Sequence, residues 1–563
     1  MKDHVDYSLY LVTDSTHALL GARDVAEVVD QAVAGGVTMV QYRDKTGDTA
    51  LLVATAKRLH EKCKAHNVPL LVNDRVDVAL AVGCEGVHLG QEDLDVAAAR
   101  QLLGDAAIIG ATVSSMQEAR IAVERGADYL GIGTLYATTT KKNTKQIIGI
   151  NGIRSILAAL DQGSPAARKI KTVCIGGVNA SNLQRIKHQL HAPRTAATPP
   201  KSIDGVAVVS AIMAAADPKA ASAHLSALSA SLPPFAARST APPVWHGNDA
   251  DETTHLLHRA VEATQNVQRT RPLSHNMTNL VVQNFAANVA LAIGASPIMA
   301  NYAQEAADLA ALGGALVVNM GTVTPDGIDN YKKAILAYNL AGAPIVLDPV
   351  GAGATAVRRA ALRQVMAVGY FDLIKGNERE IMAVARASGF AFLHEQEEEE
   401  EEDASPQQQR GVDSGAPVLA LEQKALLVQR LALRERNLVL MTGPTDVLSD
   451  GVRTYAIDNG HDYLAAITGS GCTLGTTLSA YLAANHADKL HAAVAALLHF
   501  EIAAELAAAR DDVNGPGTFV PAFIDQLYRC AKDIASGEKT WHSAARIRCL
   551  REIPHAALLL KEL

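Results

Sequence analysis

Roughly the first 215 residues repeat one pattern, in which an apolar run is followed by a turn and then by an amphipathic helical stretch. Helical stretches such as 51–66 and 115–127 separate the runs. Eight of these units predict a small parallel (β/α)8 barrel, although a doubly wound sheet would show a similar alternation. The apolar runs that we interpret as strands are 8–14, 37–44, 69–74, 86–90, 107–113, 129–135, 171–177 and 205–212.

The rest of the chain predicts a second domain. After Asp217 the composition changes, and residues 226–252 are rich in Ala, Ser and Pro without periodicity, which is typical of a linker. We therefore expect two domains, 1–240 and 241–563. Residues 394–417 are an acidic low-complexity run, which predicts a disordered insertion without a function of its own. Apolar runs that predict a second α/β domain are 313–321, 343–351, 371–377 and 437–443.

Charge and cysteine content exclude several classes of function. The net charge is −8, so the whole surface is not built to bind nucleic acid or an anionic membrane. The 6 cysteines contain no CxxC pair, which argues against disulfides and structural zinc and favours the cytoplasm. The N-terminus carries no secretory signal. The most apolar helical stretch, 490–509, contains His and Glu, so we expect it in a protein core rather than in a membrane.

Polar side chains follow the predicted strands of the first domain. In a parallel barrel the carboxyl ends of the strands share one face, and active sites form there. Any one of these residues alone is more often a solvated loop residue, but their coincidence at five successive strand ends predicts a site. Two carboxylates suit Mg²⁺, whereas Arg, Lys and Thr suit a diphosphate. The residues are Gln41, Arg43, Lys45, Asn73, Asp74, Gln91, Asp93, Thr112, Thr138, Thr140 and Lys141.

The motifs QYRDK, VND, HLGQED, TLYATTTKK and IGGV, in this order, resemble those of thiamine phosphate synthase. The resemblance implies a barrel that joins a hydroxymethylpyrimidine diphosphate to a thiazole phosphate: the diphosphate leaves, and the thiazole nitrogen captures a pyrimidine-methyl carbocation. It implies Asp74 and Asp93 as Mg²⁺ ligands. Thr112 stands at a catalytic position where the family commonly has Ser. Substrate contacts are implied for Gln41, Arg43, Lys45, Asn73, Gln91, Thr138, Thr140, Lys141, Gly177, Val209 and Ser210.

The second domain contains a different kind of anion site. It has no Walker A sequence, which excludes a P-loop kinase. Instead, Gly469, Ser470 and Gly471 stand just before an apolar helix, where free amides and the helix dipole attract anions. On its own this pattern is explained about as often by a close contact between helices. The dipole there would also favour a thiolate at Cys472, although cysteine is more often a small buried hydrophobe.

The motifs HNMTN, VVNMGT, VLDPVGAGAT, IKGNERE, MTGPTDVLSDG and ITGSGC resemble hydroxyethylthiazole kinase, a ribokinase-like family. The resemblance implies that ATP, with Mg²⁺, phosphorylates the alcohol of 4-methyl-5-(2-hydroxyethyl)thiazole. It places Asn279 and Met299 in the thiazole pocket and Cys472 beside the alcohol as a candidate catalytic base. It implies Glu380 at the Mg²⁺. Contacts on the ATP side are implied for Asp348, Lys375, Asn377, Thr442, Gly469 and Gly471.

Together the two resemblances imply a bifunctional enzyme of thiamine biosynthesis, with small-molecule substrates and no nucleic-acid or membrane partner. The kinase resemblance further implies a homo-oligomer built on kinase-domain trimers. Two alternatives stay open. A thiamine-responsive regulator would bind these ligands without turnover, but it should have lost catalytic positions, and none is lost outright. A related pyrimidine kinase could replace the second activity, which a panel of substrates would test.

Overall fold

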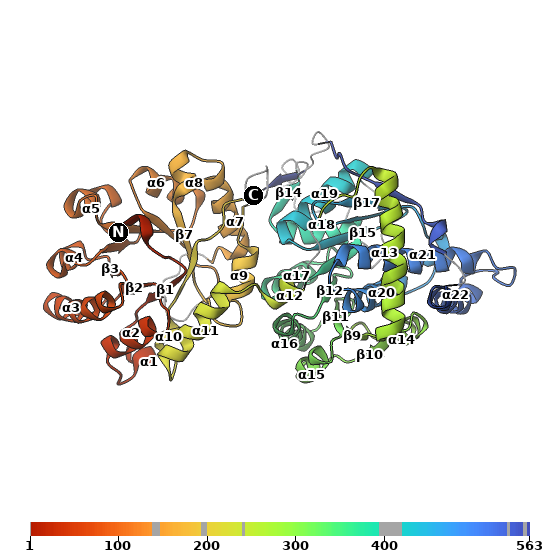
Figure 1. The fold of residues 1–563 in the computed structure, drawn as a ribbon, viewed down its shortest axis with the longest axis horizontal. Helices are drawn as coiled ribbons and strands as arrows, with labels where there is room; N and C mark the ends of the chain where they lie inside the picture. The colour runs from red at the N-terminus through yellow and green to blue at the C-terminus, as the bar shows by residue number, and fades with distance from the viewer. Residues whose placement is uncertain are drawn as a thin grey trace. The chain divides into compact units, whose positions relative to one another are not determined.

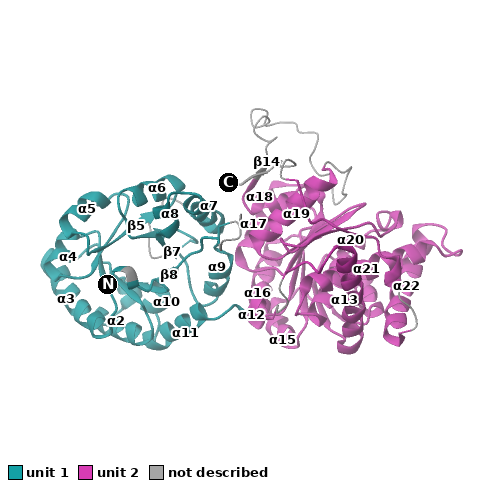
Figure 2. Cartoon of the chain, turned by 45° about the horizontal axis from the view of Figure 1, so that its top comes forward, with its two compact units in different colours: residues 1–233 teal, residues 234–563 magenta. Residues whose placement is uncertain are grey.

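The computed structural model describes residues 2–137, 147–192, 200–238, 243–392, 419–537, 541–554 and 560–562. They divide into two compact units, residues 1–233 and 234–563, drawn in teal and magenta in Figure 2. Three predicted site residues, Thr138, Thr140 and Lys141, lie outside the described residues, and so does the acidic run 394–417.

Unit 1 is a closed barrel of eight parallel strands in chain order (Figure 1). The last strand pairs with the first, with Leu11 beside Val208, and this pairing closes the sheet. The predicted barrel is therefore confirmed, and closure excludes the doubly wound alternative. The strands are β1 (Leu9–Val12), β2 (Met39–Tyr42), β3 (Leu70–Asn73), β4 (Gly86–Leu89), β5 (Ile108–Val113), β6 (Tyr129–Ile132), β7 (Lys171–Ile175) and β8 (Gly205–Val208).

Strand side chains alternate between two apolar layers in unit 1. Leu9 and Leu11 belong to the large core between barrel and helices, whereas Tyr10 and Val12 belong to a smaller core inside the barrel. Local caps start several of the helices; Asp95, for example, accepts hydrogen bonds from two backbone amides of α5. The main helices are α2 (Val25–Ala34), α3 (Thr49–Ala65), α4 (Val76–Val82), α5 (Val96–Leu103), α6 (Met116–Glu124), α7 (Gly149–Asp161), α9 (Leu183–Gln189) and α11 (Pro218–Ala230).

Unit 2 is built on a nine-stranded sheet in the order β10-β9-β11-β12-β13-β15-β16-β17-β18. The strands from β10 to β15 run parallel, and the last three join antiparallel. The four predicted strands correspond to β11, β12, β13 and β15. The bounds are β9 (Leu273–Met277), β10 (Ser296–Ile298), β11 (Ala315–Asn319), β12 (Ile345–Asp348), β13 (Leu373–Asn377), β15 (Leu438–Thr442), β16 (Asp446–Ser449), β17 (Thr454–Ile457) and β18 (Ile547–Cys549).

Helices cover both faces of this sheet and enclose a separate apolar core on each (Figure 1). One layer contains α13 (Asp249–Thr270), α14 (Gln283–Ala292), α20 (Ser470–Ala484), α21 (Lys489–Ala508) and α22 (Pro516–Ser536), with α20 packed on β9, β11 and β12. The other contains α15 (Ala306–Ala311), α16 (Pro325–Ala341), α17 (Ala356–Val368), α18 (Glu378–Ala387) and α19 (Leu421–Glu435). The carboxyl ends of the parallel strands therefore lie between two helical layers.

Helix α21 is the predicted core helix. Within the described part of the chain it alone is long and apolar enough to cross a membrane, and 89% of its apolar window is buried inside the protein. It packs against α13, α20 and α22. Its burial in unit 2 confirms the prediction from sequence.

The predicted linker is partly helical, and this corrects the sequence analysis. Residues 226–230 complete α11, residues 234–237 form α12 (Pro234–Ala237), and α13 already begins at Asp249. Phe235 is buried and stacks on Tyr370 of unit 2, with ring centroids 4.3 Å apart. The Ala-rich composition that we interpreted as a linker also favours helices, because Ala has the highest helix propensity.

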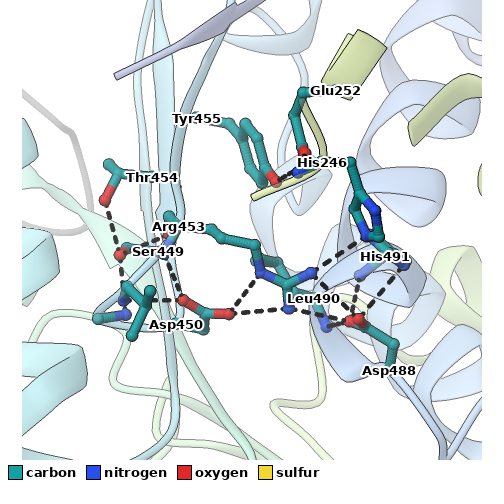
Figure 3. A network of polar contacts seen from close by, with 12 residues as sticks. His246, Glu252, Ser449, Asp450, Arg453, Thr454, Tyr455, Asp488, Leu490 and His491 are labelled. Atoms are coloured by element: carbon teal, nitrogen blue, oxygen red, sulfur yellow. Dashed lines mark hydrogen bonds and ion pairs between the residues drawn. The ribbon is translucent and has the colours of Figure 1, made fainter. Parts of the chain in front are cut away.

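A buried polar network joins α13, the β16–β17 hairpin and the start of α21 (Figure 3). The Arg453 guanidinium lies 2.9 Å from the Asp450 carboxylate and 3.1 Å from that of Asp488. The Tyr455 hydroxyl donates to Glu252 of α13 at 2.5 Å. Burial lowers the pKa of His491 to about 4, so that imidazole is neutral at physiological pH. Arg453 thus pairs with Asp450 of its own hairpin and with Asp488 at the start of α21, and Tyr455 links the hairpin to α13.

Candidate active sites

The first candidate site lies at the carboxyl ends of β2 and β3. Gln41 is the buried third residue of β2, and Arg43 and Lys45 follow the end of that strand. The Lys45 ammonium forms an ion pair with the Asp74 carboxylate. Among the described residues the Arg43 guanidinium has no hydrogen-bond or ion-pair partner, and the buried Asn73 Nδ2 has none either. Unmatched donors beside a lysine at a barrel mouth are suited to an anion.

The two predicted Mg²⁺ ligands are held by backbone contacts. Asp74 has a φ of 62°, in the left-handed region, and its amide donates to the His88 carbonyl at 3.0 Å. Asp and Asn tolerate this conformation better than most residues, and strained backbone often occurs at functional sites. The Asp93 Oδ2 accepts from the Gly90 amide at 2.7 Å. In both carboxylates Oδ1 accepts from no described residue, so one oxygen of each stays available.

No group of three or more His, Cys, Asp or Glu side chains that could hold a metal occurs in the described residues. Mg²⁺ is commonly held by one or two carboxylates together with substrate phosphates. The available oxygens of Asp74 and Asp93 fit that kind of site, in which a diphosphate supplies further ligands.

A chain of hydrogen bonds crosses the barrel interior between two predicted site residues. Gln41 Nε2 donates to the Tyr10 hydroxyl at 2.7 Å, and the hydroxyls of Tyr10 and Tyr129 lie 2.8 Å apart. The Tyr129 hydroxyl is 2.7 Å from His88 Nδ1, and His88 Nε2 is 2.8 Å from the Thr112 hydroxyl. Burial raises the pKa of both tyrosines well above the ordinary range, so both phenol hydroxyls in this set are neutral.

Gln91 reaches the end of this chain. Its Nε2 donates to the Thr112 carbonyl at 2.5 Å. The structure thus brings Gln41, Gln91 and Thr112 into one connected set. Sequence reasoning missed Tyr10, His88 and Tyr129, because inside a strand such residues follow the same pattern as ordinary core residues.

Backbone amides form the other predicted part of the first site. Gly177 follows β7 with a φ of 69°, and a Cβ there would lie 2.9 Å from the Tyr136 Cβ, so a side chain would be strained and crowded. Its carbonyl accepts from the Asn182 side chain at 2.9 Å. Val209 and Ser210 follow β8. The amides of Gly177, Val209 and Ser210 donate to no other described residue, so they are available to an anion.

The second candidate site is a ring of polar contacts in unit 2, made of Asn279, Asn319, Asp348, Lys375, Gly471 and Cys472; we call it the kinase ring. Lys375 Nζ lies 2.8 Å from Asp348 Oδ1 and donates to the Gly471 carbonyl at 2.9 Å. Asn319 Nδ2 donates to Asp348 Oδ2 at 2.7 Å. Asn279 Nδ2 donates to Asn319 Oδ1 at 3.1 Å and to Cys472 Sγ at 3.5 Å. The ends of three strands and the start of α20 therefore meet here.

The Cys472 thiol is neutral in this site. Burial and the neighbouring Asp348 carboxylate raise its pKa to about 11, although Lys375 and the amides of Asn319 and Asn279 act in the opposite direction. The sequence suggested that the helix dipole would favour a thiolate. The structure shows that desolvation outweighs the favourable contacts.

Glu380 and Asn377 form a capping box at the start of α18. Asn377 Oδ1 accepts from the Glu380 amide at 3.0 Å, and Glu380 Oε2 accepts from the Asn377 amide at 2.9 Å. Glu380 Oε1 accepts from the Gly351 amide at 2.8 Å. Burial and Asp348 raise the pKa of Glu380 to about 7. Both carboxylate oxygens are already engaged by backbone amides, so the group positions the loop after β12.

The remaining predicted residues lie around the kinase ring. Thr442 ends β15 beside Asn377. Gly469, with a φ of 85°, caps the N-terminus of α20, and a Cβ there would lie only 2.6 Å from the Val282 side chain. Met299 follows β10, and the nearby Asn301 side chain donates to the Thr278 carbonyl at 3.4 Å, which ties this loop to the one that carries Asn279.

Comparisons with known proteins agree with this division. The family model of thiamine monophosphate synthase matches residues 9–212, and that of the hydroxyethylthiazole kinase family matches residues 264–533. A solved structure of hydroxyethylthiazole kinase from Pyrococcus horikoshii is 34% identical, covers 52% of this chain and 98% of that one, and has a TM-score of 0.42.

Two relatives match nearly the whole chain. The probable thiamine biosynthetic bifunctional enzyme of Schizosaccharomyces pombe is 40% identical over 554 residues, which are 97% of this chain and 99% of the relative. The thiamine biosynthetic bifunctional enzyme of Saccharomyces cerevisiae is 35% identical over 556 residues, 94% of this chain and 96% of the relative. With a synthase barrel followed by a kinase unit in the same order, this chain belongs to the family of thiamine biosynthetic bifunctional enzymes.

Proposed function

We propose that unit 2 phosphorylates the alcohol of 4-methyl-5-(2-hydroxyethyl)thiazole with ATP. Unit 1 then joins the resulting thiazole phosphate to 4-amino-2-methyl-5-hydroxymethylpyrimidine diphosphate, giving thiamine phosphate and diphosphate. The observation that carries this proposal is the fusion itself: one chain contains both family matches and aligns with two bifunctional relatives over 97% and 94% of its length. The product of one unit is a substrate of the other.

In unit 1 the departing diphosphate needs positive charge and hydrogen-bond donors. Arg43 and Asn73 supply donors that no described residue uses, and Lys45 adds a charge held in place by Asp74. Charge-assisted contacts of this kind stabilise a leaving group as its negative charge grows. The free amides of Gly177, Val209 and Ser210 bind the thiazole phosphate. Thr138, Thr140 and Lys141 stay predictions from the sequence.

The pyrimidine is bound beside the hydrogen-bonded chain that ends in Gln41 and Thr112. The Gln41 amide at one end and the Thr112 hydroxyl at the other can form hydrogen bonds with a neutral ring. At the other end, the Gln91 side chain donates a hydrogen bond to the backbone carbonyl of Thr112. The chain keeps these groups in fixed orientations before the substrate arrives, and preorganisation of this kind lowers the cost of binding.

Asp74 and Asp93 would hold Mg²⁺ in unit 1, because each presents one unused carboxylate oxygen at the barrel mouth. When bound, the ion neutralises charge on the leaving diphosphate. In unit 2 each oxygen of Glu380 already accepts a hydrogen bond from a backbone amide, so we propose that it organises the ATP-side loop through Gly351 and Asn377 rather than by direct coordination of Mg²⁺.

In unit 2 the start of α20 binds the phosphoryl group as it passes from ATP to the oxygen of the thiazole alcohol. Gly469, Ser470 and Gly471 present amides at the N-terminus of a 15-residue helix, where the helix dipole favours negative charge. Lys375 adds an ammonium group, although it is shared with Asp348. Asn377 and Thr442 flank the ATP phosphates from neighbouring strands. Asn279, Met299 and the neutral Cys472 thiol line the pocket of the thiazole alcohol.

We also propose a homo-oligomer built on trimers of unit 2. Five large apolar side chains between residues 280 and 312 are exposed; Val281, for example, is 75% exposed. Contiguous exposed apolar patches mark protein contacts, and the proposal requires these side chains to form one. Leu280 and Val281 follow Asn279 directly and Tyr302 follows Met299 closely, so an interface here would border the thiazole pocket. The five residues are Leu280, Val281, Leu291, Tyr302 and Leu312. Light scattering of the full chain measures the oligomer size.

We place the protein in the cytoplasm, because all six of its cysteines are free thiols in the structure. Imaging of the tagged protein in intact cells checks this compartment.

Separate assays of the two half-reactions test the proposed function. The full chain is incubated with ATP, Mg²⁺ and the thiazole alcohol, and ADP is measured; it is then incubated with thiazole phosphate and the pyrimidine diphosphate, and thiamine phosphate is measured. We expect both products. Binding of these ligands without turnover would favour the regulator. ADP formed with hydroxymethylpyrimidine but not with the thiazole alcohol would favour a pyrimidine kinase in unit 2.

A further inference from the structure

Asn319, the last residue of β11, stands at the centre of the kinase ring. Its side chain is fully buried and makes three hydrogen bonds. Nδ2 donates to Asp348 Oδ2 at 2.7 Å, whereas Oδ1 accepts from Asn279 Nδ2 at 3.1 Å and from the Gly321 backbone amide at 3.0 Å. A backbone amide can only donate, so Gly321 fixes which end of the Asn319 amide carries the oxygen. The nitrogen must therefore face Asp348.

This fixed orientation is transmitted to the thiazole side of the site. Because Asn319 presents an oxygen to Asn279, the Asn279 amide must present its nitrogen in return. The same nitrogen reaches Cys472 Sγ at 3.5 Å. The side-chain oxygen of Asn279, Oδ1, then accepts a hydrogen bond from no described residue. The only hydrogen-bond donor on the thiazole alcohol is its hydroxyl, and an amide oxygen is a suitable acceptor for it.

The orientation is also transmitted to the phosphate side. Asp348 uses Oδ2 for Asn319 and Oδ1 for Lys375, so both carboxylate oxygens are held. Burial raises the pKa of Asp348, while the hydrogen bond from Asn319 and the Lys375 ammonium favour its ionised form. Lys375 in turn reaches the Gly471 carbonyl at the start of α20. A single amide thus supports both sides of the pocket.

We propose that Asn319 is a positioning residue for phosphoryl transfer, acting through Asn279 and Asp348; this rests on the proposed function of unit 2. It keeps Asn279 against Cys472 and Asp348 against Lys375 in one arrangement before the substrates bind. Supporting residues of this kind set how accurately the groups in contact with substrate are placed. A side chain that only filled space would be replaceable without a loss of turnover per folded molecule.

The first test is Asn319→Ala in the full chain. We expect kinase kcat to fall about 10- to 100-fold, the effect of losing a hydrogen bond to a charged group, with synthase turnover unchanged. Asn339→Ala is the matched control. Asn339 is also buried in unit 2, with both ends of its amide bonded to the Tyr370 backbone at 2.9 and 2.8 Å, and it makes no contact with the kinase ring. This control should lower the melting temperature but retain kinase kcat per folded molecule.

The second test is Asn319→Asp, which preserves the side-chain volume. It tests the positioning role even if the alanine variant does not fold. The new carboxyl can accept from Asn279 and Gly321 but faces the Asp348 carboxylate, which raises its pKa. Below that pKa it is protonated and can donate to Asp348 as the amide does. The kcat of the variant relative to the parent should therefore rise as the pH falls from 8 to 6. The titratable groups around it are Asp348 (β12), Lys375 (β13), Glu380 (α18), Cys472 (α20) and Tyr331 (α16).

Parental kcat in Asn319→Ala, or a constant ratio of Asn319→Asp to parent between pH 8 and 6, would overturn the proposal. Failure of the proposed function looks different: the parent itself would then form no ADP with the thiazole alcohol, whatever stands at position 319.

Discussion

At the scale of single residues, Cys472 shows how the environment decides a chemical role. Its pKa of about 11 leaves roughly one thiol in 10⁴ ionised at pH 7, and that fraction rises tenfold per pH unit below the pKa. A thiolate base would therefore make kinase kcat climb steeply with pH. The neutral thiol can instead only contact the substrate hydroxyl.

We accordingly expect Cys472→Ser to retain kinase kcat within about tenfold of the parent, because a positioned base, typically worth ~10²–10⁴ in rate, is not being removed. Kinase kcat of the parent should change less than tenfold between pH 7 and 9. Steady-state kinetics over that range check both points. A rise of about tenfold per pH unit that disappears in Cys472→Ser would show that the thiolate is the base after all.

Asp74 combines a left-handed backbone with a proposed Mg²⁺ contact, and two substitutions separate these properties. Asn tolerates a φ of 62° at least as well as Asp, whereas Ala does not. Asp74→Asn should therefore abolish most synthase turnover with little change in stability, and Asp74→Ala should in addition cost about 1 kcal/mol. Kinase turnover is the internal control. Normal synthase turnover in Asp74→Asn would refute the metal assignment.

Single residues were predictable from the sequence where they follow strands. Asn73 and Asp74 were found because a polar residue at the end of an apolar run is conspicuous, whereas Lys375 was named through the resemblance to the kinase family. Asn319 gives the same signal at the end of β11 and could have been found in the same way. Tyr129 could not, because its hydroxyl is directed into the barrel by strand pairing that sequence periodicity does not reveal.

At the scale of elements, the buried polar network around Arg453 links three segments of unit 2 and should contribute strongly to its stability (Figure 3). Arg453→Met would leave Asp450 and Asp488 without their shared guanidinium in a buried site. Removing one partner of a buried pair typically costs about 3–5 kcal/mol. Urea unfolding of the full chain, followed by a probe in unit 2, measures the change.

A surface arginine provides the control for this prediction. Arg510 pairs with the exposed Asp512 at 2.6 Å, and Arg510→Met should lower the stability of unit 2 far less than Arg453→Met does. Equal losses in the two variants would mean that burial does not matter for the Arg453 pair.

Elements were predicted well where hydrophobic periodicity is strong and poorly where it is not. All eight barrel strands and four strands of the second sheet were identified. Strand β9 was missed because its sequence, LSHNM, is half polar, and β10 because it has only 3 residues. Both are stabilised by parallel pairing with neighbours distant in the chain, which a local pattern cannot show.

At the scale of the whole molecule, the boundary between the units follows packing rather than composition. Phe235 and α12 belong to unit 2, although the predicted linker would have separated them from it. We expect fragments 1–233 and 234–563 each to fold and retain one activity. A second fragment that starts at residue 245 should be less stable, because it lacks the stacked Phe235. Circular dichroism and the two half-reaction assays check this; two inactive fragments from an active parent would contradict it.

The central claim is that one chain converts a thiazole alcohol to thiamine phosphate through both sites. The most direct measurement mixes the full chain with thiazole alcohol, ATP, pyrimidine diphosphate and Mg²⁺, and follows thiamine phosphate by mass spectrometry. We predict that the product forms, disappears when ATP is omitted, and returns without ATP when thiazole phosphate is supplied. No product in the complete mixture, or product from the thiazole alcohol without ATP, would contradict the account.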